Sequence, residues 1–493
     1  MKKTISILLA LLMALSLFAC TAKTAEPAAE ATAAPAEEAV PAEEAAPAEE
    51  AAAPEEAGFD PNMVIEFNDA VLESMVRTAM NKPEGDILVS DAQAMTELSL
   101  EMDGSDWSIE RIHNLDALKY FTNLTKLSLA WSVQNGEQWY GDVDISALAG
   151  MTKMTTLQIR CINVADISAL SNMKDLERLL LAGTNRLNDL SPLANCKKLL
   201  TVDMPSNSIT DISVLAGLTE LQEVLLNDNF VSDVTPLAGL THLTLLKLGD
   251  NPIKDYSSLA GIRPNLTDCD FEPDSGPQPI VFNDALLEQK IRAALNKPEG
   301  DITLADTEAV TELWIGNEWQ QEIPDDQQIR DTSALKYFPN LTKLSLSSCG
   351  VSDIEALRVM TNLGEAMLDN SFIRDIRPLL ACKNLYWLNL SACECTEADL
   401  APLAQMTGLA WLNIAYSNNV HDISVLANLT GLKALDMRGI SVDLSPLAGL
   451  KNLTTLYLPE PYESEKGNYS PDYSIFKDIY PNLKEKNFEL PTE

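Results

Sequence analysis

The feature that most constrains this chain is a motif that returns at a nearly constant interval. The stretch DISVLAGLTELQEVLLNDN (Asp211–Asn229) is followed by a near-copy, DVTPLAGLTHLTLLKLGDN (Asp233–Asn251). The Asp that opens this motif recurs in steps of 22 or 23 residues from Asp144 to Asp255, each time four residues before an apolar residue, usually Leu. A constant period in the twenties predicts a solenoid, in which every repeat forms one coil that stacks on the next.

A larger duplication lies on top of the short repeat. Phe67–Ile87 reappears almost unchanged as Phe282–Ile302, and Ala117–Leu129 reappears as Ala334–Leu346. A module of about 215 residues is therefore present twice. We predict five parts: an N-terminal signal peptide at 1–19, a tether at 20–57, a first repeat module at 58–273, a linker at 274–279 and a second repeat module at 280–493.

Each repeat carries the spacing L-x-x-L-x-L, as in Leu243, Leu246 and Leu248. The alternating last pair predicts a short strand with one buried side. Three residues after it stands Asn251, whose amide can satisfy backbone groups in its own coil and in the next one. Stacked coils would place their strands side by side in parallel, about 4.8 Å apart. At the start of each module, the apolar spacing in Asn68–Met80 and in its copy Asp284–Leu295 predicts a helical cap.

This pattern resembles the leucine-rich-repeat family, and the 22-residue form N-x-I-x-D-I-S-x-L is closest to the internalin type of bacterial surface protein. The resemblance covers roughly 95–272 and 310–490. It implies an α/β repeat solenoid: two tandem leucine-rich-repeat modules with parallel concave sheets and helical N-terminal caps. It also implies protein recognition or adhesion. Cys349 and Cys393 depart from the pattern, because they stand where Asn is usual, and a disulfide between them remains open.

The N-terminal segment MKKTISILLALLMALSLFAC has two lysines followed by an apolar run, which is typical of a signal peptide. Its end, Leu17–Cys20, resembles a bacterial lipobox. That resemblance implies cleavage before Cys20, a lipid on its thiol and a place on the outer face of the cell membrane, in the bacterial envelope. An ordinary secretory signal is the alternative. Residues 21–57 are almost wholly Ala, Pro, Glu and Thr, which predicts a disordered tether.

Charge and motif content restrict the function. The net charge of −38 argues against nucleic-acid binding, which requires a basic face, and leaves the Cys20 lipid as the expected contact with a membrane. The histidines His113, His242 and His421 lie in separate coils, without partners at metal-ligand spacing. We therefore expect no catalytic residue, no metal site and no cofactor, and a binding protein rather than an enzyme.

The candidate binding surface lies on the expected concave face of the second module. Trp387 and Trp411 occupy the same strand position in successive coils, so they should lie side by side. The predicted partner-binding residues are Trp314, Trp387, Asn389, Trp411, Asn413 and Tyr457. The two central tryptophans could instead simply cover each other and the sheet. A protein ligand is the favoured partner and a glycan is the alternative. An enzyme or transporter-linked solute receptor, or a passive spacer in the envelope, remains open.

Overall fold

The computed structural model describes residues 58–102, 112–131, 143–160, 162–184, 186–271, 279–464 and 467–490. The predicted signal peptide, Cys20, the tether and most of the 274–279 linker lie outside these ranges. Contacts gather the region 54–493 into one compact unit. Below, module 1 means the described residues up to 271 and module 2 those from 279 onward. None of the described helices is both long and apolar enough to cross a bilayer.

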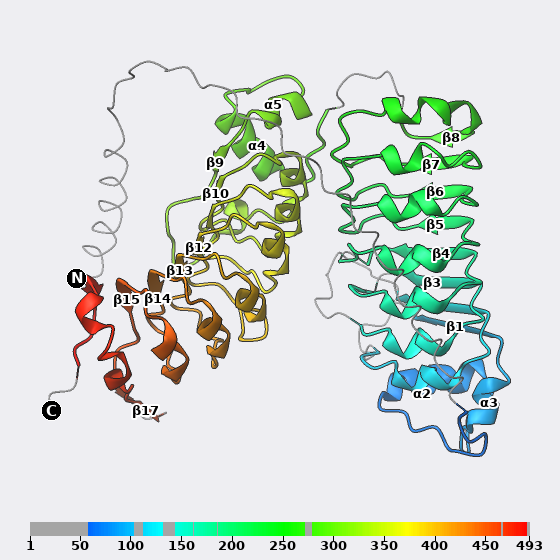
Figure 1. Cartoon of the computed structure of the whole chain (residues 1–493), viewed down its shortest axis with the longest axis horizontal. Helices are drawn as coiled ribbons and strands as arrows, with labels where there is room; N and C mark the ends of the chain where they lie inside the picture. Colours follow the sequence, from blue (N-terminus) through cyan, green and yellow to red (C-terminus); the bar gives the residue numbers. More distant parts are fainter. Residues whose placement is uncertain are drawn as a thin grey trace, which may run out of the picture. The chain divides into compact units, whose positions relative to one another are not determined.

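Two eight-stranded sheets, in which all neighbouring strands are parallel, organise the fold (Figure 1). The first sheet contains β1 (Glu97–Met102), β2 (Lys126–Trp131), β3 (Thr156–Arg160), β4 (Arg178–Ala182), β5 (Thr201–Asp203), β6 (Glu223–Leu225), β7 (Leu245–Lys247) and β8 (Asp268–Cys269). The second contains β9 (Glu312–Trp314), β10 (Lys343–Ser345), β11 (Glu365–Met367), β12 (Trp387–Asn389), β13 (Trp411–Asn413), β14 (Ala434–Asp436), β15 (Thr455–Tyr457) and β18 (Glu485–Lys486). A hairpin of β16 (Tyr462–Ser464) and β17 (Gly467–Tyr469) interrupts the last coils. The predicted repeat solenoid of parallel strands is confirmed.

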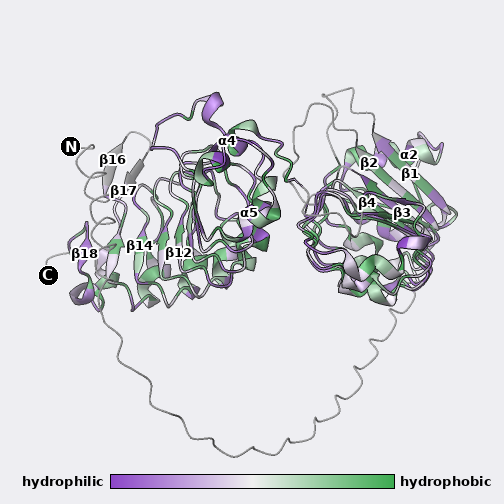
Figure 2. Ribbon diagram, turned by 90° about the horizontal axis from the view of Figure 1, so that it is seen from above, coloured by the Kyte–Doolittle hydropathy of each residue, from purple (hydrophilic) through white to green (hydrophobic). Residues whose placement is uncertain are grey.

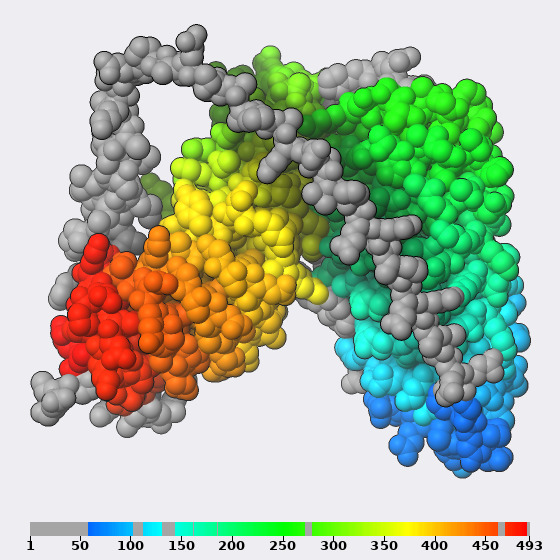
Figure 3. All heavy atoms as spheres, viewed as in Figure 1, coloured from blue at the N-terminus to red at the C-terminus, as the bar shows by residue number. Residues whose placement is uncertain are grey.

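A 3-10 helix follows most strands and forms the opposite wall of the solenoid. In module 1 these are η1 (Asp116–Tyr120), η2 (Ser146–Gly150), η3 (Ser168–Asn172), η4 (Ser191–Asn195), η5 (Ser213–Gly217), η6 (Thr235–Leu237), η7 (Ser257–Gly261) and η8 (Arg263–Asn265). In module 2 they are η9 (Asp325–Gln327), η10 (Ser333–Tyr337), η11 (Glu355–Val359), η12 (Arg377–Ala381), η13 (Ala401–Gln405), η14 (Ser424–Asn428), η15 (Ser445–Gly449), η16 (Tyr473–Phe476) and η17 (Tyr480–Asn482). Figure 3 shows the stacked coils as successive bands of colour within each module.

The core of each module is a ladder of apolar side chains that repeats from coil to coil. In the first sheet, Leu179, Val202 and Val224 face one another in register on β4, β5 and β6, and all three are fully buried. The second sheet repeats this with Leu388, Leu412 and Leu435. Hydrophobic residues therefore recur along the strands of both modules (Figure 2). No single coil could bury such a ladder, so stability depends on stacking.

Each module begins with a helical cap, as predicted. Helix α2 (Ala70–Ala79) buries Leu72 and Val76, and α3 (Val89–Gln93) follows it. The Asp69 carboxylate accepts hydrogen bonds from the backbone of α2 through one oxygen and from His113 N, at 2.6 Å, through the other. Module 2 repeats this arrangement with α4 (Ala285–Ala294), α5 (Leu304–Glu308) and Asp284. The duplicated aspartate therefore both caps its helix and ties it to the first coil.

A buried polar ladder runs beside each apolar one. In module 1, Asn229 and Asn251 each donate from Nδ2 to carbonyls of their own coil and of the preceding one. In module 2 smaller side chains donate to the carbonyl of the preceding coil. Cys393 Sγ, for example, donates to Leu368 O at 3.3 Å. Cys349 and Cys393 are both free thiols, and a whole coil, β11, lies between theirs, so the disulfide left open by the sequence does not form.

The recurrent aspartate that precedes the 3-10 helices experiences two opposite environments. Asp422 is exposed, and the backbone and side chain of Ser424 donate to it, which lowers its pKa. Asp353 accepts from Glu355 N at 2.8 Å, but burial, with the Glu355 charge nearby, raises its pKa to about 6. The same motif position should therefore contribute to stability with opposite sign in the two coils.

We expect Asp353→Asn to raise the free energy of unfolding by about 2 kcal/mol at pH 7 and to have little effect at pH 4. The folded state holds the Asp353 proton up to about pH 6 while the unfolded chain loses it near 3.8, so this group costs stability as pH rises through that window. Urea unfolding at both pH values measures the effect. Asp422→Asn is the matched control: its lowered pKa stabilises the fold at neutral pH and not in acid, so its loss should appear only at pH 7.

Candidate functional site

The centre of the candidate site is a pair of stacked tryptophans on the solvent-facing side of the second sheet. Trp387 and Trp411 face each other in register on β12 and β13, with ring centroids 4.1 Å apart and planes 5° from parallel. Such a pair contributes about 1 kcal/mol beyond its buried area. Both side chains remain partly exposed. Because each ring covers one face of the other, a ligand can reach their outward edges and the two outer faces.

The two asparagines beside the tryptophans differ in their bonding. Asn389 is fully engaged: Nδ2 donates to Asp369 Oδ1 at 2.9 Å, and Oδ1 accepts from Ser391 N at 3.1 Å. Asn413 accepts from Ala415 N at 2.9 Å. Its Nδ2 has no acceptor among the residues that the structure describes. Asn413 is only 8% exposed, but its Nδ2 is not used by a neighbour among the described residues, whereas Asn389 orients its neighbours.

The outer face of Trp411 lies toward β14, where the side chains in register are small. Its partner at this position is Ala434, and Thr455 follows on β15. One row further along the strands, Asn413 is followed by Asp436 and Tyr457. The second ring face of Trp411 consequently has only a methyl group as its neighbour in register, with polar groups beside it.

A charged and aromatic group borders this position. Asp436 accepts from Arg438 Nε at 2.9 Å and from its Nη2 at 2.5 Å, and this hydrogen-bonded carboxylate raises the pKa of Arg438. The guanidinium also lies 5.1 Å from the centre of the Tyr457 ring. Burial raises the pKa of Tyr457. The opposite charges of Asp436 and Arg438 therefore neutralise each other, and their paired hydrogen bonds hold both side chains in place.

Tyr416 is a further residue of this surface that the repeat pattern did not indicate. It is 53% exposed and has a φ of 63°, a backbone conformation that is costly for a bulky residue. A side chain at Gly439 would meet it, since a Cβ there would stand 2.8 Å from Tyr416 Cδ1. Repeats in module 1 place Ser206, Asp228 and Asp250 at such left-handed positions. An exposed aromatic kept there, with a glycine beneath it, indicates a role at the surface.

The structure brings together some of the predicted site residues and separates one. Trp387, Asn389, Trp411 and Asn413 are contiguous on β12 and β13, and Tyr457 lies two strands further on. Trp314 is on β9, three strands from β12, where it is 51% exposed and donates from Nε1 to Glu312 at 3.2 Å. Tyr457 is partly buried, not simply exposed. We use the name Trp411 surface for Trp387, Trp411, Asn413, Tyr416, Ala434 and Tyr457.

The titratable groups next to the tryptophan pair are engaged in hydrogen bonds. Tyr386, next to the pair, donates its hydroxyl to Glu365, and that bond raises its pKa to about 12. Burial raises the pKa of the Asp369 carboxyl, which Ser347 and Asn389 hold in place. No group of three or more His, Cys, Asp or Glu side chains suited to a metal ion occurs within the described ranges.

Solved structures that are similar to this chain include leucine-rich-repeat proteins. An internalin (InlF) from Listeria monocytogenes matches at 23% identity and a TM-score of 0.32, over 86% of this chain and 96% of its own. Internalin C2 from the same organism matches at 25% identity and 0.33, over 42% and 94%. A leucine-rich-repeat protein of Leptospira interrogans matches at 16% and 0.31, over 81% and 97%. No family model and no curated protein matches the chain.

Both modules are repeat solenoids built from parallel strands, the fold that the repeats in the sequence predict. The parallel sheets, the apolar ladders and the wall of 3-10 helices establish this fold. The matching structures belong to the family that the 22-residue repeats resemble. Function has to be argued from the surface itself, since a repeat solenoid does not determine what it binds.

Proposed function

We propose that this chain is a binding protein of the bacterial cell envelope, anchored by a lipid at Cys20, in which the Trp411 surface recognises a protein partner. The observation that carries the proposal is the in-register stack of Trp387 and Trp411 beside Asn413, whose Nδ2 has no acceptor among the described residues. Tryptophan and tyrosine are enriched among residues that dominate binding energy. The strained, exposed Tyr416 supports the same surface.

The geometry also suggests how a partner would fit. A flat or branched apolar side chain can lie on the outer face of Trp411, above Ala434, while Asn413 Nδ2 donates to a backbone carbonyl next to it. The bound group would thereby cover ring area that the stack leaves exposed. Rigid neighbours such as the Asp436–Arg438 pair reduce the entropy lost on binding.

Glycan binding is the second candidate. A sugar ring can also stack on an aromatic face, and Asn413 Nδ2 can donate to a hydroxyl oxygen. The same outer face of Trp411 and the same donor, Asn413 Nδ2, support it. The chemical class of the captured ligand therefore distinguishes glycan binding from protein binding. Either ligand would bind without chemical turnover, as expected for a surface without a catalytic group.

We expect Trp411→Ala to weaken binding at least about 30-fold, or about 2 kcal/mol, because it removes the central ring of the surface. The measurement is quantitative capture by the full chain from cell-surface protein extracts and, in parallel, from wall and mucin glycans. Ala434→Leu should weaken binding similarly by filling the space beside an intact tryptophan stack.

Trp314→Ala is the matched control, since it removes an exposed tryptophan from the same sheet three strands away. It should change affinity less than about threefold. Equal retention of the ligand by all three variants would show that the tryptophan stack is structural. Selective capture of a glycan would replace the protein partner by the second candidate.

A further inference from the structure

A second surface, distinct from the Trp411 surface, has a charge opposite to that of the chain. It is a groove of about 860 Å³ lined by residues of both modules. Among the described lining residues there is one carboxylate, Glu355. The cations that line it are Arg186, Lys254, Lys336, Arg358, Arg377 and Lys383. In a chain with a net charge of −38, such a concentration of positive charge is exceptional.

Most of these cations have carboxylate partners, and the partners lie largely outside the lining. Lys336 pairs with Asp228 at 3.0 Å, and Lys254 pairs with Glu308 at 2.6 Å. Arg358 uses Nε and Nη2 for Glu355. Lys336 is nearly buried, with a side chain that is 4% exposed, whereas the other paired cations keep part of their side chains exposed at the groove.

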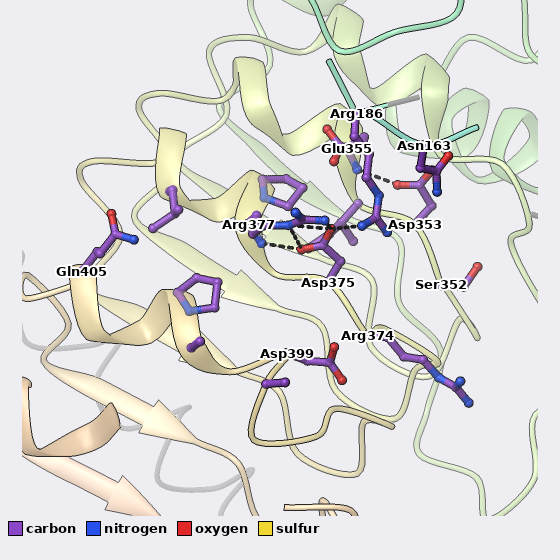
Figure 4. Close-up of a pocket in the computed structure, with 16 residues that line it drawn as sticks. Asn163, Arg186, Ser352, Asp353, Glu355, Arg374, Asp375, Arg377, Asp399 and Gln405 are labelled. Atoms are coloured by element: carbon purple, nitrogen blue, oxygen red, sulfur yellow. Dashed lines mark hydrogen bonds and ion pairs between the residues drawn. The ribbon is translucent and has the colours of Figure 1, made fainter. Parts of the chain in front are cut away.

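Arg186 and Arg377 share one further carboxylate. Figure 4, a close-up of a neighbouring pocket that both arginines also line, shows their guanidinium groups directed at Asp375. The distances are 3.3 Å for Arg186 and 2.7 Å for Arg377. These groups already have the geometry in which arginine holds carboxylates. The described lining thus contains six cations and one carboxylate, Glu355.

Lys383 is the cation of this set that has no acidic partner among the described residues. It follows η12 and is exposed, as Lys451 is in a later repeat. Lys451 occupies the equivalent position of a later repeat, outside the groove lining, and both lysines donate their backbone N–H to the carbonyl two residues earlier. The two differ in their surroundings and not in their local backbone. Charge in a concave surface focuses the field on a ligand more strongly than charge on an open wall does.

Between the cations the lining is apolar. Val359 and Leu380 are partly exposed, and Phe230 lies beneath the Lys336 ammonium at 5.6 Å. We propose that this groove binds an acidic peptide segment, with carboxylates on the lysines and arginines and apolar side chains on Val359 and Leu380. An acidic glycan fits less well, because the one aromatic ring in the described lining, Phe230, is buried and already covered by Lys336.

The test measures fluorescence anisotropy of a short labelled peptide of glutamates interspersed with valine and proline, added to the full chain at low and physiological salt. Binding should weaken as salt rises, because exposed charges are screened. Lys383→Glu should weaken it about tenfold, whereas Lys451→Glu should leave it within about twofold. Trp411→Ala should have no effect, because the two surfaces are separate; failure of one proposal therefore leaves the other standing.

Three results would overturn the proposal. The first is no saturable binding of the acidic peptide at low salt. The second is equal weakening by Lys383→Glu and Lys451→Glu, which would indicate a general charge effect. The third is binding of oligogalacturonate as tightly as the peptide, which would replace the peptide by an acidic glycan. A peptide with lysine in place of glutamate should fail to bind; its binding would equally contradict the charge argument.

Discussion

Replacing Asn229 by alanine is expected to lower the free energy of unfolding by about 3 kcal/mol. The side chain is fully buried, and it bonds two coils at once. Nδ2 donates to Met204 O at 2.9 Å and to Leu226 O at 3.0 Å, while Oδ1 accepts from Ile209 N at 3.0 Å. Alanine would leave these backbone groups in the core without partners, and each such group costs about 1–3 kcal/mol.

Module 2 supplies the control for this prediction. There Cys393 and Ser417 perform the same task with one small donor each, to Leu368 O and Leu390 O, both at 3.3 Å. Asn229→Ser should therefore lose clearly less stability than Asn229→Ala, since a hydroxyl can still donate to the preceding coil. Urea unfolding of the two variants measures the difference. Equal losses, or a loss below 1 kcal/mol for alanine, would contradict the role assigned to the ladder.

The sequence predicted those features that the repeat period determines. The strands, their parallel order and the adjacency of Trp387 and Trp411 follow from counting residues, because a solenoid converts sequence spacing directly into position. The spacing of 24 residues between these tryptophans did not disturb the register, since the extra residues lie outside β12 and β13. The caps were predictable for a similar reason: an exposed end of the apolar ladder requires a cover.

Features that depend on the conformation of one side chain were not predictable. The period places two tryptophans side by side but does not say whether their rings stack. Nor does it indicate that Tyr416 adopts a left-handed conformation above Gly439. The clearest case is the duplicated sequence ALKYF: its lysine is exposed at Lys119 and buried at Lys336. Identical local sequence therefore gives opposite environments, because the surroundings of Lys336 come from residues more than 100 positions away.

Asp228→Asn is expected to lower the free energy of unfolding by about 3 kcal/mol, mainly because it leaves the buried Lys336 ammonium without a carboxylate partner. The Lys336 side chain is 4% exposed, and its ammonium donates to Asp228 Oδ1 at 3.0 Å. The ring centres of Phe230 and Tyr337 lie 5.6 Å from the ammonium. Cation–π interactions with these rings are too weak to replace an ion pair with a carboxylate. Asparagine tolerates the φ of 55° at this position, so the variant removes charge without adding backbone strain.

Two further variants separate the buried charge from other causes. Lys336→Met added to Asp228→Asn should recover most of the loss, because removing both partners leaves no unpaired charge in the core. Lys119→Ala, at the exposed copy of the same motif, should change stability by less than about 0.5 kcal/mol. Urea unfolding of the four proteins measures all of these differences. If the double variant were as unstable as Asp228→Asn alone, the cost would not come from an unpaired buried charge, and the role assigned to the Asp228–Lys336 pair would be wrong.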